Sequence, residues 1–180
     1  MAAFTLGFSL FVEVTLTPAL CAGLRIVTLW DTLSLDLGES PQNSIPLFKG
    51  LSVAQCRMVA LMASLRNVAA GTPLMRIGEQ DREMYVIIDG ALRVWKEGPG
   101  GGGQIELRTS ERGDVMGDVG LFTGERSANV DVAKDARLLR FTPSNLQRLR
   151  KRYPKIAATV MRNLNEILAR RLWDLTERLR

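Results

Sequence analysis

The residues best suited to chemistry lie between Gly113 and Val130, where four glycines surround a short run of charged and small residues. Glycine permits close approach of the backbone, and the exposed amides of a short helical turn attract anions. Arg126 adds a planar cation with five donors, which suits a phosphate group. Asp118, eight residues earlier, can accept a hydrogen bond from a sugar hydroxyl. This segment, the cassette below, therefore has the groups needed to hold one phosphodiester.

Short alternating runs broken by glycine surround the cassette and predict the strands that position it. Their even spacing between Leu65 and Phe141 favours an all-β roll or barrel. The predicted strands are 66–70, 73–77, 83–89, 91–96, 104–110, 127–131 and 136–141.

Helical patterns flank this predicted roll on both sides. Ser52 is a suitable N-cap for a helix from Val53 to about Ser64. Pro143 opens a short helix through Arg152, and Pro154 opens a longer one that runs to the C-terminus. An apolar stripe along the last helix is expected to pack on the roll, to pair two copies of the chain, or both. It consists of Leu164, Leu168, Leu172, Leu175 and Leu179.

The composition excludes several classes of function. The chain has 180 residues, 46% of them apolar, which is enough for one domain with accessory helices. It has no histidine, and Cys21 and Cys56 are its only cysteines, so His-based metal sites, Ser–His triads and a disulfide framework are excluded. No nucleophile–base pair or metal-ligand cluster is visible, and we expect neither an enzyme nor a bound metal. The net charge of +5 is concentrated towards the C-terminus, where a solvated basic helix face is favoured over a nucleic-acid or membrane contact.

The N-terminal segment is apolar from Ala2 to Leu24, with Glu13 as its only charge, and is long enough to span a bilayer. Glu13 followed by Pro18-Ala19-Leu20 resembles the last membrane helix of resistance-nodulation-division-type exporters, a similarity that covers residues 1–31. It implies attachment to a membrane or transporter through residues 1–30. A buried or amphipathic N-terminal helix is the alternative. We therefore divide the chain into an apolar segment at 1–33, a polar linker at 34–44 and a domain at 45–180.

Residues 45–179 resemble the cyclic nucleotide-binding domain family. Besides the cassette, the similarity rests on Pro46-Leu47-Phe48, Gly71, Gly78-Glu79 and the run from Met84 to Val94. The order of helix, β-roll, cassette and two helices is also that of the family. The resemblance implies an α+β fold that is mainly β. Its centre would be an antiparallel, double-stranded jelly-roll-like β-roll, with an N-terminal helical segment and two C-terminal helices.

The resemblance also implies roles for five cassette residues. Asp118 would accept from the ribose 2′-hydroxyl, Arg126 would pair with the cyclic phosphate, and Ser127 would donate a hydroxyl. Gly117 and Val119 would contribute backbone groups. Two departures bear on affinity: Asp118 stands where the family usually has glutamate, which shortens its reach by ~1.5 Å, and its spacing to Arg126 is at least one residue shorter than usual. Ser127, where cGMP-binding members tend to have threonine, favours cAMP over cGMP.

The function implied is a non-enzymatic regulatory module in the cytoplasm that binds a cyclic nucleotide and signals through its two C-terminal helices. In the family the final helix covers the base, which makes Met161, Leu164 and Leu168 candidates for that contact. One alternative is a β-roll that binds nothing and serves as an assembly or docking domain. Another is a catabolite activator-type transcription regulator without its DNA-binding domain. No helix-turn-helix pattern follows the long helix, so no DNA partner is expected.

Overall fold

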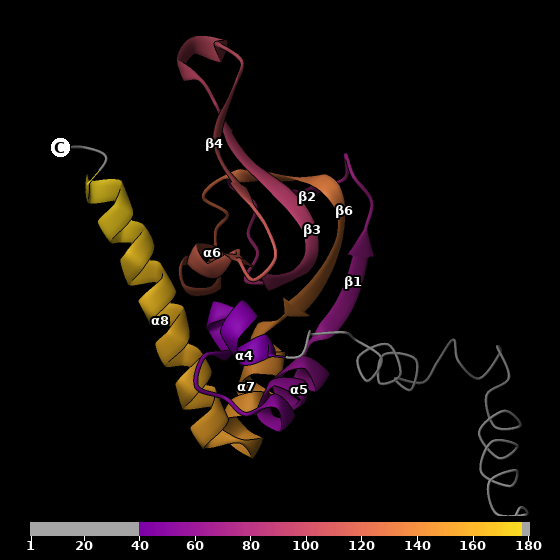
Figure 1. Ribbon diagram of the computed structural model, residues 1–180. Helices are drawn as coiled ribbons and strands as arrows, with labels where there is room; N and C mark the ends of the chain where they lie inside the picture. The colour runs from indigo at the N-terminus through magenta and orange to yellow at the C-terminus, as the bar shows by residue number, and fades with distance from the viewer. Residues whose placement is uncertain (1–39, 178–180) are drawn as a thin grey trace, which may run out of the picture. The chain divides into compact units, whose positions relative to one another are not determined.

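An antiparallel six-stranded sheet, curled into a roll, is the centre of the computed structural model, which describes residues 40–177 (Figure 1). The two longest strands, β3 and β6, pair with each other along most of their length. β1 and β2 also pair with β6, while β4 and β5 pair with β3. The strands are β1 Ser64–Val68, β2 Pro73–Met75, β3 Met84–Glu97, β4 Gln104–Ser110, β5 Val115–Met116 and β6 Asn129–Phe141. The predicted antiparallel β-roll is confirmed.

The prediction that the chain breaks at Gly90 is wrong, because β3 continues through it as one bulged strand. The register between β3 and β6 shifts around this position, and Gly90 has φ +91°. A side chain at Gly90 would overlap the carbonyl oxygen of Asp135 and lie 2.6 Å from the Cα of Ala136. Glycine therefore permits a bulge at a close backbone contact without ending the strand. The predicted strands 127–131 and 136–141 likewise form one strand, β6.

The bulge also keeps the inward face of β3 apolar as the strand curls. Core residues before Gly90 have odd numbers, Tyr85 and Ile87, whereas those after it have even numbers, Leu92 and Val94. One inserted residue changes the side of the sheet to which later side chains point. Facing them in the roll core are Val130, Val132, Ala136 and Leu138 of β6, with Met75 and Met116.

The helices lie largely at one end of the roll, where α4, α5, α7 and the start of α8 gather (Figure 1). Their bounds are α4 Pro41–Ser44, α5 Val53–Met62, α6 Asp118–Thr123, α7 Pro143–Arg152 and α8 Pro154–Glu177, with short 3-10 turns η1 Pro46–Phe48 and η2 Pro99–Gly101. Reciprocal capping boxes start α5, at Ser52 and Gln55, and α7, at Thr142 and Asn145. The helix starts predicted at Val53, Pro143 and Pro154 are confirmed by the bounds of α5, α7 and α8. α4 shows that the last part of the predicted linker is helical.

Two buried asparagines tie the C-terminal helices to the N-terminal helical segment. Asn163 of α8, 2% exposed, donates from Nδ2 to the carbonyls of Leu47 at 2.9 Å and Lys49 at 2.7 Å. Asn145 of α7 donates to the carbonyl of Met62 at 2.6 Å. Hydrogen bonds from buried amides to these carbonyls hold α7 and the first half of α8 against the N-terminal helical segment.

The leucine stripe of α8 packs over only part of its length. Leu164 is fully buried and Leu168 is half-buried, whereas Leu172 and Leu175 are 67% and 59% exposed. Leu179 lies outside the described residues. The second half of α8 thus runs beside α6 with its apolar side chains open to solvent or to a ligand (Figure 1).

The predictions for residues 1–33, including a membrane helix, lie outside the described residues. Within residues 40–177, none of the helices combines the length and the apolar character that crossing a bilayer requires. The same part of the chain holds no cluster of three or more potential metal ligands. Cys56 is buried in α5, and burial raises the pKa of its thiol, in agreement with a packing role.

Candidate functional site

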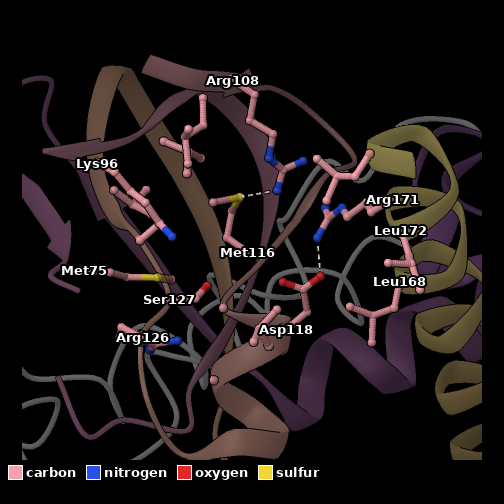
Figure 2. Close-up of a pocket in the computed structure, with 18 of the residues that line it drawn as sticks. Met75, Lys96, Arg108, Met116, Asp118, Arg126, Ser127, Leu168, Arg171 and Leu172 are labelled. Atoms are coloured by element: carbon pink, nitrogen blue, oxygen red, sulfur yellow. Dashed lines mark hydrogen bonds and ion pairs between the residues drawn. The ribbon is translucent and has the colours of Figure 1, made fainter. Parts of the chain in front are cut away.

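A cavity of about 690 Å³ lies where the cassette, the strands β3 and β4 and the second half of α8 meet (Figure 2). This volume falls in the range of small-molecule sites. The cassette side contributes the five residues predicted to bind a ligand, namely Gly117, Asp118, Val119, Arg126 and Ser127. The structure therefore brings all of them to one cavity, although the shortened spacing from Asp118 to Arg126 had put that arrangement in question.

Arg126 is held inside the protein and is not a surface arginine. It is only 2% exposed. Its Nη2 forms an ion pair with Asp81, and its Nη1 donates to the carbonyl of Glu83 at 2.7 Å. Its Nε is buried and has no hydrogen-bond partner within residues 40–177. A nearly buried cation in a cavity wall, with one buried donor unsatisfied, is suited to an anionic ligand that reaches it.

Glycine at position 117 makes this placement of Arg126 possible. Gly117 has φ +74°, and a side chain there would overlap Nη1 of Arg126 and lie 2.5 Å from the carbonyl oxygen of Glu83. Hydrogen bonds also fix the main chain of Arg126. Its N–H donates to the carbonyl of Glu79, and its carbonyl accepts from the N–H of Gly78. The cassette glycine thus serves a close side-chain approach as well as a turn.

The carboxylate of Glu83 anchors the strand that offers its carbonyl to Arg126. It forms an ion pair with Arg140 and accepts from the hydroxyl of Tyr85 at 2.9 Å. The hydrogen bond from Arg140 lowers the pKa of Glu83, against the opposing effect of burial, and the bond from Tyr85 lowers it further. This network holds the start of β3 against β6.

Gly117 is the N-cap of α6, and Asp118 is the first residue of the helix. Asp118 is only 5% exposed. Its carboxylate forms an ion pair with Nη1 of Arg171 on α8. Nη2 of Arg171 donates to the carbonyl of Val115 at 2.7 Å. The residue expected to accept from a ribose is therefore bonded to the C-terminal helix, an interaction that Figure 2 shows across the cavity. Arg171 belonged to a basic face in the sequence, and nothing in its spacing singled it out.

Two more cations line the cavity, Lys96 of β3 on the side of Ser127 and Arg108 of β4 beside Met116 (Figure 2). Arg108 is half-buried, and its Nη2 lies 3.5 Å from the sulfur of Met116. Burial lowers the pKa of the Arg108 guanidinium, and the neighbouring charge of Arg171 lowers it further, while Asp114 and Asp118 oppose the change.

Of the three residues of α8 predicted to cover a base, only Leu168 lines the cavity. Leu164 is fully buried and does not line the cavity, and neither does Met161. The helix instead contributes residues from its next turns, including Leu172 and Leu175. The leucine stripe itself was the signal that could have extended the prediction to them.

Residues 65–153 match the cyclic nucleotide-binding domain family. They belong to that family. The match covers the roll, the cassette and α7, and the predicted resemblance is thereby confirmed for this part of the chain. Its order of elements agrees with the antiparallel roll and flanking helices seen here.

Known proteins that share this domain differ widely in what surrounds it. A cyclic nucleotide-gated potassium channel of Mesorhizobium japonicum is 31% identical over 115 residues, which is 63% of this chain and 30% of the channel. Glutaminase 1 of Bradyrhizobium diazoefficiens is 27% identical over 140 residues, 77% of this chain and 22% of the relative. The crystal structure of the Thermus thermophilus catabolite activator protein is similar with a TM-score of 0.67 and 28% identity, covering 74% of this chain and 61% of that one. The chain thus spans less than a third of the two sequence relatives.

Proposed function

We propose that the cavity binds a 3′,5′-cyclic nucleotide. In this arrangement the cyclic phosphate lies against Arg126 and Ser127, and the ribose 2′-hydroxyl donates to Asp118. The observation that carries the proposal is the burial of Arg126 in the cavity wall with its Nε unpartnered within residues 40–177. A buried donor without an acceptor costs about 1–3 kcal/mol, and a shift of the Arg126 side chain that brings this donor to a phosphate oxygen removes that cost.

We propose further that α8 reports occupancy of the cavity. Asp118 holds Arg171 in the structure, so a ribose hydroxyl that takes the carboxylate competes with the helix for the same group. The first half of α8 stays anchored through Asn163, and its second half is then free to shift. The response is a population shift, whose size is limited by how much better the ligand binds one position of α8 than the other.

Titration calorimetry of the purified chain with cAMP and with cGMP tests the binding proposal. We expect dissociation constants of about 1–100 μM for at least one of them. The Arg126→Gln variant removes a charge-assisted phosphate contact, which should weaken binding by about 30- to several thousand-fold. Arg137→Gln changes an arginine of β6 outside the cavity and is the matched control.

Folding is checked separately, because Arg126 also pairs with Asp81. A cooperative thermal transition in Arg126→Gln shows that the loss of binding is a loss of contact. Ser127→Ala adds a milder change, with an expected loss of about 5- to 10-fold. A folded wild-type chain that releases no heat with either nucleotide up to about 1 mM contradicts the proposal.

A docking module that binds no nucleotide is the second candidate. It is favoured by the fact that both charges needed for the ligand already have protein partners, Asp81 for Arg126 and Arg171 for Asp118. The same calorimetric titration separates the two functions.

In either case we propose a regulatory role without chemistry of its own, exerted in the cytoplasm on whatever the module is attached to. The sequence pattern of residues 1–30 supports attachment to a membrane or transporter. The exposed Leu172, Trp173 and Leu175 support pairing of two copies along α8.

A further inference from the structure

The end of the roll where the helices gather carries a strong positive charge (Figure 1). The segments that form it, 40–63 and 142–165, hold eight Lys and Arg residues and no Asp or Glu. Without these eight cations the net charge of the chain would change from +5 to −3. All eight side chains are exposed, and together they are called the basic end below. They are Lys49, Arg57, Arg148, Arg150, Lys151, Arg152, Lys155 and Arg162.

Most cations of the basic end have no partner within residues 40–177. Lys49 and Arg162 pair with Glu166, and Arg152 donates from Nε to the Tyr153 hydroxyl at 3.2 Å. In that part of the chain the other five form neither an ion pair nor a side-chain hydrogen bond. A surface that concentrates unpaired charge of one sign attracts a partner of the opposite sign.

Helix stabilisation accounts for only part of this charge. Arg150, Lys151 and Arg152 lie in the last turn of α7, where cations interact favourably with the helix dipole. Lys155 lies in the first turn of α8, where a cation is unfavourable. The sequence favoured a solvated helix face for the C-terminal cations. The structure adds Arg57 of α5, a helix that contacts α7, so the charge spreads over more than one helix face.

The apolar and aromatic residues of the same segments indicate what kind of anionic partner fits. Val53 and Met58 of α5 are 36% and 37% exposed, and such side chains enter the headgroup region of a bilayer. Aromatic rings for stacking on nucleobases are lacking, because Phe48 is fully buried and Tyr153 is half-buried with the Arg152 guanidinium 5.7 Å from its ring centre. From the charge and these side chains we propose that the basic end docks on an anionic lipid surface.

This docking does not rest on nucleotide binding, because none of the eight cations lines the cavity. It gives the domain a membrane contact of its own, separate from attachment through residues 1–30. Stable attachment to a bilayer takes two signals, and a basic surface beside an apolar segment provides both.

Partitioning of the purified chain into lipid vesicles tests the proposal. One set of vesicles is phosphatidylcholine alone, and in the other phosphatidylglycerol replaces about a third of it. Insertion of an apolar segment contributes alike to both sets and cancels in the ratio of the two affinities. Each Lys or Arg near an anionic surface contributes about 5-fold, so we expect the anionic vesicles to bind the chain about 100-fold more tightly or better.

Two matched double variants locate the effect. Arg148→Gln with Lys151→Gln removes two exposed cations of α7 and should lower the ratio about 25-fold. Lys134→Gln with Arg137→Gln, on β6, also removes one Arg and one Lys and should change the ratio by less than about 2-fold, because charges beyond a Debye length are screened. Raising NaCl from about 0.1 M to about 1 M shortens that length from about 10 Å to about 3 Å and should bring the wild-type ratio close to one.

Three outcomes overturn the proposal. The first is equal binding to the two kinds of vesicle. The second is a ratio that falls equally in both double variants, since net charge and not the basic end would then explain binding. The third comes from a duplex DNA titrated at the same salt concentration: tighter binding to the duplex than to the anionic vesicles, lost in the α7 variant, assigns the basic end to nucleic acid. Nucleotide binding is measured separately by calorimetry, so its failure and the failure of lipid docking are distinguishable.

Discussion

The ion pair between Arg171 and Asp118 should stabilise the ligand-free protein far more than a surface pair does. We would measure it with a double-mutant cycle made of Arg171→Met, Asp118→Asn and the double variant. Each substitution removes the charge and keeps most of the side-chain volume. The cycle therefore isolates the interaction between the two residues from their contacts with others.

The expected size follows from the burial of the two side chains. Arg171 is 24% exposed and Asp118 is 7% exposed, so both charges lose much of their solvation. Breaking a fully buried pair costs about 3–5 kcal/mol, and a charge-assisted hydrogen bond contributes about 1.5–3 kcal/mol. Because Arg171 remains partly solvated, we expect a coupling energy of about 2–3 kcal/mol. For a protein of this size, a free energy of about 2–3 kcal/mol corresponds to about 5–10 °C in Tm, and Arg171→Met should lower Tm by at least this much because it also loses the bond to the Val115 carbonyl.

The assay is urea unfolding of the purified chain followed by circular dichroism, at one salt concentration. The internal control is a second cycle on Lys49 and Glu166, which join the N-terminal helical segment to the same helix. These side chains are 70% and 54% exposed and 3.9 Å apart. Their coupling should be below about 1 kcal/mol. A coupling for Arg171 and Asp118 no larger than this would refute the argument.

The Arg171→Met variant also tests whether the ligand and α8 compete for Asp118. If they do, Arg171→Met binds the cyclic nucleotide more tightly, by at most the coupling energy, or about 30- to 140-fold. An unchanged or weaker affinity would mean that the ribose hydroxyl and Arg171 use different oxygens of one carboxylate. In that case α8 closes over the ligand and is not displaced by it.

Two further predictions concern the roll that carries the site. Gly90→Ala should destabilise the protein by at least about 3 kcal/mol in urea unfolding, because the added methyl group meets the Asp135 carbonyl and the backbone has a positive φ. Gly71→Ala, with a positive φ but open space around it, should cost about 1 kcal/mol. Similar losses of stability in the two variants would contradict the close contact at Gly90. Glu83 has a pKa lowered from 4.5, so its contribution to stability is present above that value and is lost as the pH falls through the lower, folded-state pKa. Unfolding between about pH 7 and about pH 3 should therefore show a smaller loss of stability for Glu83→Gln than for the wild-type chain, and parallel curves would contradict a role for the Arg140 pair.

The elements that the sequence predicted best are those with local signals at both ends. α7 has the predicted bounds, because Thr142 caps it, Pro143 begins it and Pro154 starts the next helix. β4 also has the predicted bounds, between a glycine-rich tip and the turn before Gly113. Each signal lies within a few residues of the boundary that it marks, so no knowledge of the tertiary structure was needed.

The error in β3 has a different origin. A glycine between two alternating runs indicates either a turn or a bulge, and the two interpretations differ only in what the glycine meets in space. At Gly90 it meets the backbone at Asp135 and Ala136. That contact joins segments 45 residues apart, and no local pattern reports it.

In the candidate site, too, the residues with a local sequence signal were predicted, and those contributed by distant parts of the chain were not. This difference bears on function. The cassette residues were predictable because they lie on one short segment with a characteristic order of types. The residues that hold them, Asp81 for Arg126 and Arg171 for Asp118, lie 45 and 53 positions away. Lone charged residues have no periodicity that would single them out. Yet these partners determine what a ligand must do on entry, since both charged side chains that would bind it already have protein partners. A ligand that takes Asp118 from Arg171 acts directly on α8, so the coupling between binding and helix position lies in a pair that only the structure shows.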